Sequence, residues 1–245
     1  MNCYAVIPAR YASSRFPGKP LALLQGKPII QHVWERVSQS GLFNEVIIAT
    51  DDLKISAEAQ AFGAVVMLTD SELPSGTDRV AAVSEYLEEN SIILNVQGDE
   101  PLISADALKA LLSAFDDSEV LMASLMTKFA DAREATNPNM VKVVTDSRQN
   151  ALYFSRSPVP YNRDNTENTN YMRHIGVYAF RYKALMRFVS LEPGKLEILE
   201  KLEQLRALEN GIPIRMVYSD YQGIGIDTPE DLERIEKLFK KGIIK

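Results

Sequence analysis

Several features are scarce or missing in this chain of 245 residues, and each absence excludes a class of protein. A single cysteine, Cys3, excludes an internal disulfide and favours the cytoplasm as compartment. No stretch approaches the ~18 apolar residues of a membrane span, and Val6-Ile7 runs into Pro8 and Arg10, far short of the ~7–15-residue apolar core of a signal peptide. A net charge of −6 argues against a general nucleic-acid-binding protein. We therefore expect a cytoplasmic protein that engages neither nucleic acid nor membrane.

Two common phosphate-binding motifs are also missing. Neither the GxxxxGK[ST] pattern of P-loop NTPases nor the GxGxxG pattern of dinucleotide-binding proteins occurs. A cationic loop over residues 8–19 is present instead, with Arg10, Arg15 and Lys19 and no acid. Residues 1–36 hold five basic side chains and one acidic one, which leaves the rest of the chain at −10. This local positive charge predicts a loop that binds phosphates, with a solvated basic loop as the alternative.

Apolar runs and helical periodicities alternate along the first half of the chain. We expect strands over residues 4–7, 45–50, 64–68 and 91–96, and helices over 28–37, 53–62 and 77–89. Continuous Val and Ile runs indicate strands that are covered on both faces. The pattern predicts an α/β fold with a mixed, mostly parallel central sheet and flanking helices.

The second half has more strands and fewer helices. Strands are expected over residues 120–127, 140–145, 151–155 and 175–180, and a long surface loop over 158–170. Leucines at every third position from Leu196 to Leu208 predict one helix whose stripe is core or a subunit seam. Asp227 is expected to be the N-cap of a C-terminal helix.

No clear linker divides the chain, so we expect a single domain over residues 1–245. Within it we distinguish three parts, at about 1–115, about 116–215 and 216–245. The family resemblance described below implies that the first is the nucleotide-binding part, the second the sugar-binding and dimerisation part, and the third a metal-ligand strand end with a helix.

Three polar clusters follow predicted strands, over residues 8–19, 75–79 and 97–101. Ligands of open parallel sheets bind at the carboxyl ends of strands, so these clusters are expected to converge. Asp99 is a plausible ligand for Mg²⁺, and Asp227 is a possible second one, although helix capping alone would also explain Asp227. Ser75 and Gly76 open a helix close to this edge, where a plain cap is the alternative.

The two histidines differ in their surroundings. His32 lies among apolar neighbours of the first helix, which favours a structural role. His174 lies near arginines and Tyr178, a combination that suits a polyhydroxy partner with a carboxylate.

Seven segments together resemble one enzyme family. They are PARYASSRFPGKPL (8–21), SGTDR (75–79), NVQGDEP (95–101), ALYFSRSPVPYNRD (151–164), RHIGVYAFR (173–181), LEKLEQLRALENGI (199–212) and GIDTPEDLERI (225–235). In this order they are similar to the 3-deoxy-manno-octulosonate cytidylyltransferases, which make CMP-Kdo. The first segment alone would indicate only a sugar-nucleotide synthetase.

The resemblance implies a nucleotide-diphospho-sugar transferase (GT-A-like) fold and the reaction of CTP with the sugar acid Kdo. It also implies Mg²⁺, a homodimer and a role in lipopolysaccharide synthesis. The relatives that use 8-amino-Kdo, and the CMP-sialate synthetases, stay as alternatives for the substrate. A glycosyltransferase would have a DxD-type motif where this chain has GDE, and a nucleotide sensor would not need Lys19 with two aspartates.

The family pattern also implies a set of site residues. The implied catalytic residues are Arg10, Arg15, Lys19, Asp99 and Asp227, with Asp99 and Asp227 as metal ligands. The implied nucleotide-binding residues are Pro8, Ala9, Arg10, Arg15, Lys19, Ser75, Gly76, Arg79 and Gln97. The implied sugar-binding residues are Gln97, Arg156, Arg163, His174, Tyr178, Glu203 and Gln204.

Overall fold

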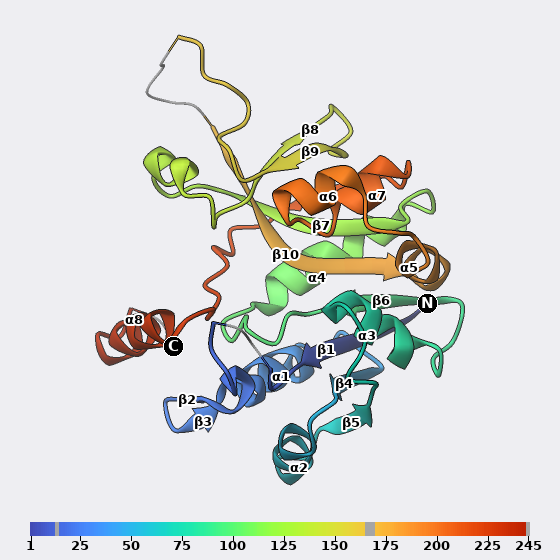
Figure 1. Ribbon diagram of the computed structural model, residues 1–245, viewed down its shortest axis with the longest axis vertical. Helices are drawn as coiled ribbons and strands as arrows, with labels where there is room; N and C mark the ends of the chain where they lie inside the picture. Colours follow the sequence, from blue (N-terminus) through green and yellow to red (C-terminus); the bar gives the residue numbers. More distant parts are fainter. Residues whose placement is uncertain (13–14, 165–169, 244–245) are drawn as a thin grey trace. The chain divides into compact units, whose positions relative to one another are not determined.

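The first strand, β1 (Asn2–Ala9), is the inner strand around which the N-terminal part is arranged (Figure 1). The computed structural model describes residues 1–12, 15–164 and 170–243. The chain folds as two compact units, the first made of 1–105 with 223–245 and the second of 106–222. The expectation of a single domain stays a prediction.

The first unit contains four parallel strands in the order β6 (Ser91–Asn95), β1, β4 (Glu45–Thr50) and β5 (Val65–Leu68). The chain runs outward from β1 to β5 and then returns to β6. Right-handed crossovers therefore place the first two connecting helices on one face and the third on the other. These helices are α1 (Ile29–Gln39), α2 (Leu53–Ala61) and α3 (Gly76–Ser84).

Burial explains why these strands read as continuous apolar runs. Ala5, Val6 and Ile7 are all fully buried, so both faces of β1 are covered. Helix α1 buries one stripe, Ile29, Ile30, Val33 and Val37, and leaves its other side polar. His32 bonds through Nε2 to the Leu24 carbonyl at 2.7 Å, in agreement with the structural role expected for it.

The first unit is completed by short elements and the last helix, α8 (Pro229–Lys240). The short elements are the 3₁₀ turn η1 (Lys19–Leu21) and the two-stranded ribbon of β2 (Leu23–Leu24) and β3 (Lys27–Pro28). Ile226 and Ile235 pack with Leu24 and Ile29 in one buried apolar cluster. This cluster fixes the C-terminal segment against the start of the chain.

The second unit has mixed strand directions. Strand β7 (Met122–Lys128) pairs in parallel with β11 (Ile214–Tyr218) and antiparallel with β10 (Met172–Arg181). Strand β8 (Lys142–Thr145) pairs antiparallel with β10 and with β9 (Ala151–Ser155). The remaining elements are α4 (Ala105–Ser113), η2 (Ala114–Asp116), η3 (Ala132–Thr136), α5 (Tyr182–Val189), α6 (Lys195–Glu200) and α7 (Leu205–Glu209). The predicted α/β class and most predicted strands are confirmed.

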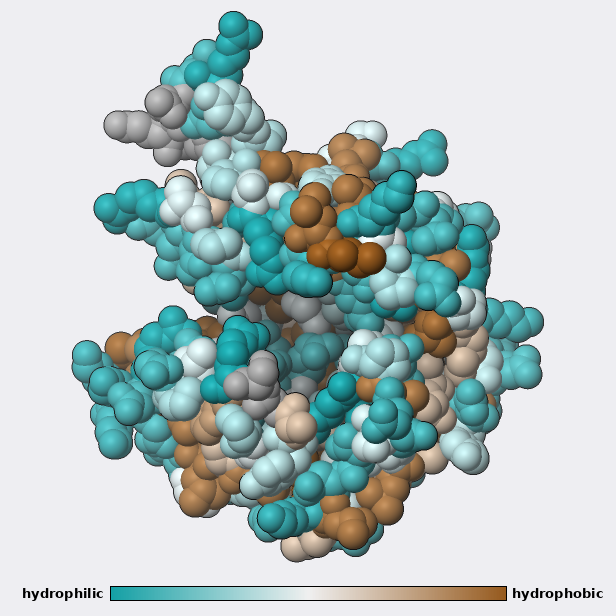
Figure 2. Space-filling view, viewed as in Figure 1, coloured by the Kyte–Doolittle hydropathy of each residue, from teal (hydrophilic) through white to brown (hydrophobic). Residues whose placement is uncertain are grey.

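Two local predictions are wrong. The leucine stripe does not lie on one helix, because Lys201 adopts a left-handed conformation, with φ 54°, and ends α6 before α7 begins. Leu199 of α6 is exposed while Leu202 and Leu205 are buried, and Figure 2 shows apolar side chains gathered over α6. Asp227 is not the N-cap of α8, since Thr228 holds that position and its hydroxyl accepts from the Asp231 amide.

Part of the loop expected over residues 158–170 lies outside the described residues, as do residues 13–14 of the cationic loop. No helix among the described residues is long and apolar enough to cross a membrane.

The capping assignment predicts a stability difference. Thr228→Ala removes the capping hydroxyl, so we expect a loss of about 1 kcal/mol in the free energy of unfolding. In a chain of this size that lowers the melting temperature by about 2–4 °C. Thr228→Ser keeps the hydroxyl and should melt close to the parent protein in the same calorimetric scan. Equal melting of the two variants would contradict the cap.

Candidate active site

The candidate active site of the first unit is organised by an ion cluster. Lys19 Nζ lies 2.7 Å from Asp99 Oδ2 and 3.3 Å from Asp227 Oδ1. The Lys19 side chain is only 14% exposed, whereas that of Arg15, 3.4 Å from Asp227, is 60% exposed. The structure thus brings together four of the five residues expected to be catalytic.

Local backbone structure places Lys19 at this point. Gly18 precedes it with φ 72°, a left-handed conformation that glycine adopts without strain. The Gly18 amide donates to the Tyr11 carbonyl at 2.9 Å, which closes the cationic loop on itself. The turn η1 then starts at Lys19 and directs its ammonium to the carboxylates.

The two aspartates come from distant parts of the sequence. Asp99 follows β6, where a Cβ on Gly98 would lie 2.9 Å from the Pro8 carbonyl oxygen, so glycine is needed for the ends of β1 and β6 to approach. The Ile226 amide donates to the Asp99 carbonyl at 2.9 Å. This backbone hydrogen bond sets Asp227 next to Asp99.

The ammonium of Lys19 contacts both carboxylates, so Asp99 and Asp227 lie close enough to share one cation. Among the described residues there is no group of three or more His, Cys, Asp or Glu side chains placed to hold a metal ion. Mg²⁺ commonly takes one or two carboxylates and completes its shell with substrate phosphates and water. Asp99 and Asp227 therefore fit a magnesium ion that is shared with a phosphorylated substrate.

Arg10 joins this loop to the segment ahead of α3. Its guanidinium donates to the Leu73 carbonyl and, at 3.5 Å, to the Pro74 carbonyl. Its Nε is buried and has no hydrogen-bond partner among the described residues. The predicted contact of Arg10 with a triphosphate stays a prediction.

The segment Ser75–Arg79 holds the start of α3. Ser75 Oγ accepts from the amides of Thr77 and Asp78, both at 3.1 Å, so the helix cap that the sequence left as the alternative is formed. A Cβ on Gly76 would lie 3.4 Å from the Pro8 side chain, which leaves this backbone close to the end of β1. Proximity of Ser75 and Gly76 to a nucleotide stays a prediction.

Arg79 is fully buried, and its role in the structure is internal. Its guanidinium pairs with Asp51 at 2.9 Å and donates to Thr69 Oγ1. These interactions fasten α3 to the segments after β4 and β5. The nucleotide contact expected of Arg79 receives no support from this geometry and stays a prediction.

The end of β1 and the end of β6 carry the remaining nucleotide-side residues. Ala9 is buried, and Pro8 and Ala9 pair in register with Ala49 and Thr50 of β4. Gln97 donates through Nε2 to Asn95 Oδ1 at 3.0 Å, which orients its amide.

The sugar-side residues other than Gln97 belong to the second unit, and three of them form a buried cluster. His174 contacts Tyr178, with ring centroids 5.5 Å apart, and Gln204 Nε2 lies 3.4 Å from His174 Nδ1. Burial, together with Arg173, lowers the pKa of His174 to about 3. Burial and the charge of Glu203 raise the pKa of Tyr178. Both side chains are therefore neutral near pH 7.

The arginines expected to bind the sugar differ in placement. Arg156 donates to the carbonyls of Glu200, Pro138 and Lys201 at 2.7, 2.9 and 3.2 Å. Much of its guanidinium thus holds α6 to the end of β9. Arg163 is exposed in a turn.

Sequence reasoning missed two residues of this region. Glu200 accepts from Ser155 Oγ and the Arg156 amide, at 2.8 and 3.0 Å. Ser124 is fully buried and lies 2.8 Å from His174 Nε2. A serine inside an apolar strand gives no signal in a single sequence, because only the packing of β10 against β7 reveals its partner.

Comparisons with known proteins agree with the geometry. A family model described as cytidylyltransferase matches residues 4–216. A 3-deoxy-manno-octulosonate cytidylyltransferase from Solibacter usitatus is 48% identical over 98% of this chain and 95% of its own length. One from Thermodesulfovibrio yellowstonii is 47% identical over 97% of this chain and 98% of its own length.

The chain belongs to the 3-deoxy-manno-octulosonate cytidylyltransferase family. A solved structure of CMP:2-keto-3-deoxy-manno-octonic acid synthetase complexed with CTP matches it with a TM-score of 0.93 and 44% identity, over 99% of this chain and 100% of that one. A 4-diphosphocytidyl-2C-methyl-D-erythritol synthase from Anaerococcus prevotii matches with a TM-score of 0.65 and 16% identity, over 98% of each chain, which shows the fold alone. The resemblance read from the sequence is confirmed.

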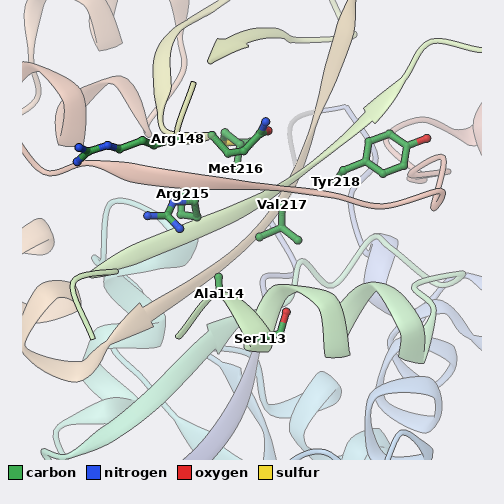
Figure 3. Close-up of a pocket in the computed structure, with 8 residues that line it drawn as sticks. Ser113, Ala114, Arg148, Arg215, Met216, Val217 and Tyr218 are labelled. Atoms are coloured by element: carbon green, nitrogen blue, oxygen red, sulfur yellow. The ribbon is translucent and has the colours of Figure 1, made fainter. Parts of the chain in front are cut away.

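This member of the cytidylyltransferase family also has a separate open pocket of about 340 Å³ in the second unit. Figure 3 shows Arg148 and Arg215 at one end and Tyr218 at the other. Arg215 is engaged by Asp117 at 3.3 Å and by Asn150 at 3.1 Å. None of the residues expected at the site lines this pocket.

The lowered pKa of His174 predicts a pH dependence of stability. The unfolded chain binds a proton to this imidazole below about pH 6.5, whereas the folded chain does so only near pH 3. Protonation of the unfolded chain therefore leaves the free energy of unfolding unchanged above pH 6.5 and lowers it as the pH falls from 6.5 towards 3. Between pH 7 and pH 5 the loss should be about 2 kcal/mol.

Chemical denaturation at several pH values measures this effect, with His174→Gln as control. The glutamine does not titrate, so its stability should fall less over the same interval. Parallel pH profiles of the two proteins would contradict a neutral buried His174.

Proposed function

We propose that the protein transfers CMP from CTP to 3-deoxy-D-manno-octulosonate (Kdo), which gives CMP-Kdo and pyrophosphate. The observation that carries this proposal is the cluster of Lys19 from η1, Asp99 after β6 and Asp227 ahead of α8. Family membership, at 48% identity over nearly the full chain, supplies the substrate class. The relatives' names support Kdo as the acceptor, and 8-amino-Kdo or another sugar acid such as sialic acid is the alternative.

The first task of the site is to bind an anion on a chain whose net charge is −6. Two like unit charges at ~4 Å repel by about 4 kcal/mol at an effective dielectric of ~20. Lys19 and Arg15 reduce this repulsion for the triphosphate. We infer that Arg10 acts with them, and that all three stabilise charge that develops on the departing pyrophosphate.

We infer that Asp99 and Asp227 hold Mg²⁺. When bound, the ion neutralises phosphate charge and lowers the pKa of a coordinated hydroxyl. Lys19, which pairs with both carboxylates in this structure, is then available for a phosphate oxygen.

The acceptor has to present its anomeric hydroxyl in line with the α-phosphorus of CTP. We infer that Arg156, Arg163, His174, Tyr178, Glu203, Gln204 and Gln97 bind the sugar acid. Neutral His174 and Tyr178 offer directional hydrogen bonds in a buried setting, which orients a polyhydroxy ring without adding charge. A dedicated histidine base is not part of this proposal, because a His174 with a pKa of about 3 is a weak base.

We further propose a homodimer that works in the cytoplasm and serves lipopolysaccharide synthesis. The exposed Leu199 and Ile198 of α6, over which Figure 2 shows an apolar patch, support association of two copies. Sedimentation velocity at micromolar concentration tests the dimer directly.

The function is tested by incubating the protein with CTP, Mg²⁺ and one sugar acid at a time, with pyrophosphate release as readout. Kdo should give rapid release, and 8-amino-Kdo and sialic acid should give little. Preference for 8-amino-Kdo would select the first alternative, and preference for sialic acid the second. Absence of release with every sugar acid would refute cytidyl transfer.

The metal role is tested by Asp99→Asn, which keeps the side-chain size and removes its charge. Turnover should fall by at least about 10²-fold because a charged metal ligand is lost. Asp106→Asn, an exposed aspartate of α4, is the matched control and should retain parental turnover. Near-normal turnover of Asp99→Asn, with the same melting temperature as the control, would remove Asp99 from the metal site.

A further inference from the structure

A buried chain of polar groups crosses the second unit from β7 to α7. Ser124 Oγ lies 2.8 Å from His174 Nε2, 2.9 Å from the Val177 carbonyl oxygen and 3.2 Å from the Ile175 carbonyl oxygen. On the other side of the imidazole, Gln204 Nε2 lies 3.4 Å from Nδ1. Ser124 and His174 are 0% and 7% exposed, and Gln204 is 4% exposed, so bulk solvent has little access to these polar groups, which bond to one another.

An irregularity in β10 creates this arrangement. Ile175 pairs with Leu125 of β7, and Tyr178 pairs with Ser124, so Gly176 and Val177 have no partner of their own in the ladder. The extra residues turn two carbonyls of β10 towards the Ser124 hydroxyl. Bulges of this kind re-aim side chains and are common next to active sites.

The number of available donor hydrogens decides which group donates and which accepts in each bond from Ser124 through His174 to Gln204. The carbonyls of Ile175 and Val177 can only accept, and Ser124 has one proton to give. When that proton goes to Val177, His174 must donate from Nε2 to Ser124 Oγ. Its Nδ1 is then bare and accepts a hydrogen from the Gln204 amide.

A bond in which Ser124 donates to His174 conflicts with the other hydrogen bonds of the cluster. If Ser124 donated to Nε2, the hydrogen of neutral His174 would sit on Nδ1 and face the NH₂ group of Gln204. Two donors would then meet, and neither bulge carbonyl would receive the serine proton. Only rotation of the Gln204 amide would relieve the clash.

His174 is held as a neutral ring by its other neighbours. The Phe154 ring packs edge-on at 4.8 Å, and the Tyr178 ring lies at 5.5 Å. The charged groups near the cluster are Arg173, beside His174, and Glu203, which acts on Tyr178. Because the ring carries one hydrogen only, the choice of nitrogen decides which end of Gln204 faces it.

We propose that Ser124 is a positioning residue that fixes His174 with its hydrogen on Nε2 and so turns the Gln204 carbonyl oxygen towards the hydroxyls of the sugar acid. This proposal rests on the proposed function, in which Gln204 belongs to the acceptor site. Gln204 Oε1 takes no part in the bonds from Ser124 to His174 and serves as an acceptor for a substrate hydroxyl. Specificity for the sugar then depends on a serine that does not touch it.

The first test reads the imidazole directly and needs no turnover. Long-range ¹H–¹⁵N spectra of the intact protein distinguish the two forms of a neutral histidine. The chain has only two histidines, so His32→Gln identifies the signals of His174. We expect hydrogen on Nε2 in the parent protein and in Ser124→Thr, and a shift to Nδ1 in Ser124→Ala.

The second test measures steady-state kinetics. Ser124→Ala should raise KM for Kdo about tenfold, since one oriented hydrogen bond is lost, and leave KM for CTP unchanged. Ser124→Thr should restore the parental KM. Thr127→Val is the matched control: Thr127 is also a fully buried hydroxyl of β7, but it contacts Gln222 rather than His174. That variant should change neither the imidazole signals nor KM for Kdo.

The outcomes separate the two proposals. Hydrogen on Nδ1 in the parent protein, or unchanged signals in Ser124→Ala, overturns the role of Ser124 whatever the turnover. A changed imidazole with an unchanged KM for Kdo overturns the link from Ser124 to the sugar. Absence of turnover in the parent protein with every sugar acid refutes the proposed function, while the spectra still report on the imidazole.

Discussion

The candidate active site depends on one electrostatic constraint, the close approach of Asp99 and Asp227 around the ammonium of Lys19. Two carboxylates held this close together repel each other unless a cation lies between them. Lys19 Nζ provides that cation at 2.7 and 3.3 Å. The backbone bond from Ile226 to Asp99, and the apolar cluster of Ile226 and Ile235, hold the two acids together even though they are far apart in sequence. The packing of the C-terminal segment therefore holds the two carboxylates close together, and a cation between them offsets their repulsion.

The sequence predicted the elements that depend on local pattern. Strand β1 was visible as an apolar run, and the approach of Lys19 to Asp99 followed from the rule that the clusters after neighbouring strands meet at one edge of the sheet. The role of Asp227 as cap was wrong because Thr228 and Asp227 are both good caps, and sequence cannot tell which hydrogen-bonds the helix. The outcome is favourable for metal binding, since the Asp227 carboxylate faces Lys19 instead of the helix amides.

The features that sequence did not predict depend on contacts between distant residues or on a single backbone angle. The left-handed conformation of Lys201 divides the leucine stripe into α6 and α7. Helix ends of this kind usually have glycine or asparagine at the left-handed position, so a lysine gives no sign of one in the sequence. Arg79 stands in a motif with the nucleotide-side residues, but burial against Asp51 gives it a structural part. Ser124 acquires its importance only from the bulge in β10.

The two substrates call for opposite physical solutions. In the proposed function, a triphosphate is recognised through charge, which Lys19, Arg10 and Arg15 would supply in a region that is partly open to solvent. A polyhydroxy ring differs from its relatives mainly in where its hydroxyls point, so charge discriminates poorly between them. Buried groups with a fixed hydrogen-bond direction discriminate well, because a wrongly placed hydroxyl leaves a buried acceptor without a partner. If these residues bind the sugar as proposed, the neutral state of His174 serves its selection, since a protonated imidazole would donate from both nitrogens and could no longer fix the orientation of Gln204. Tyr178 is neutral as well and adds no charge to this part of the proposed site.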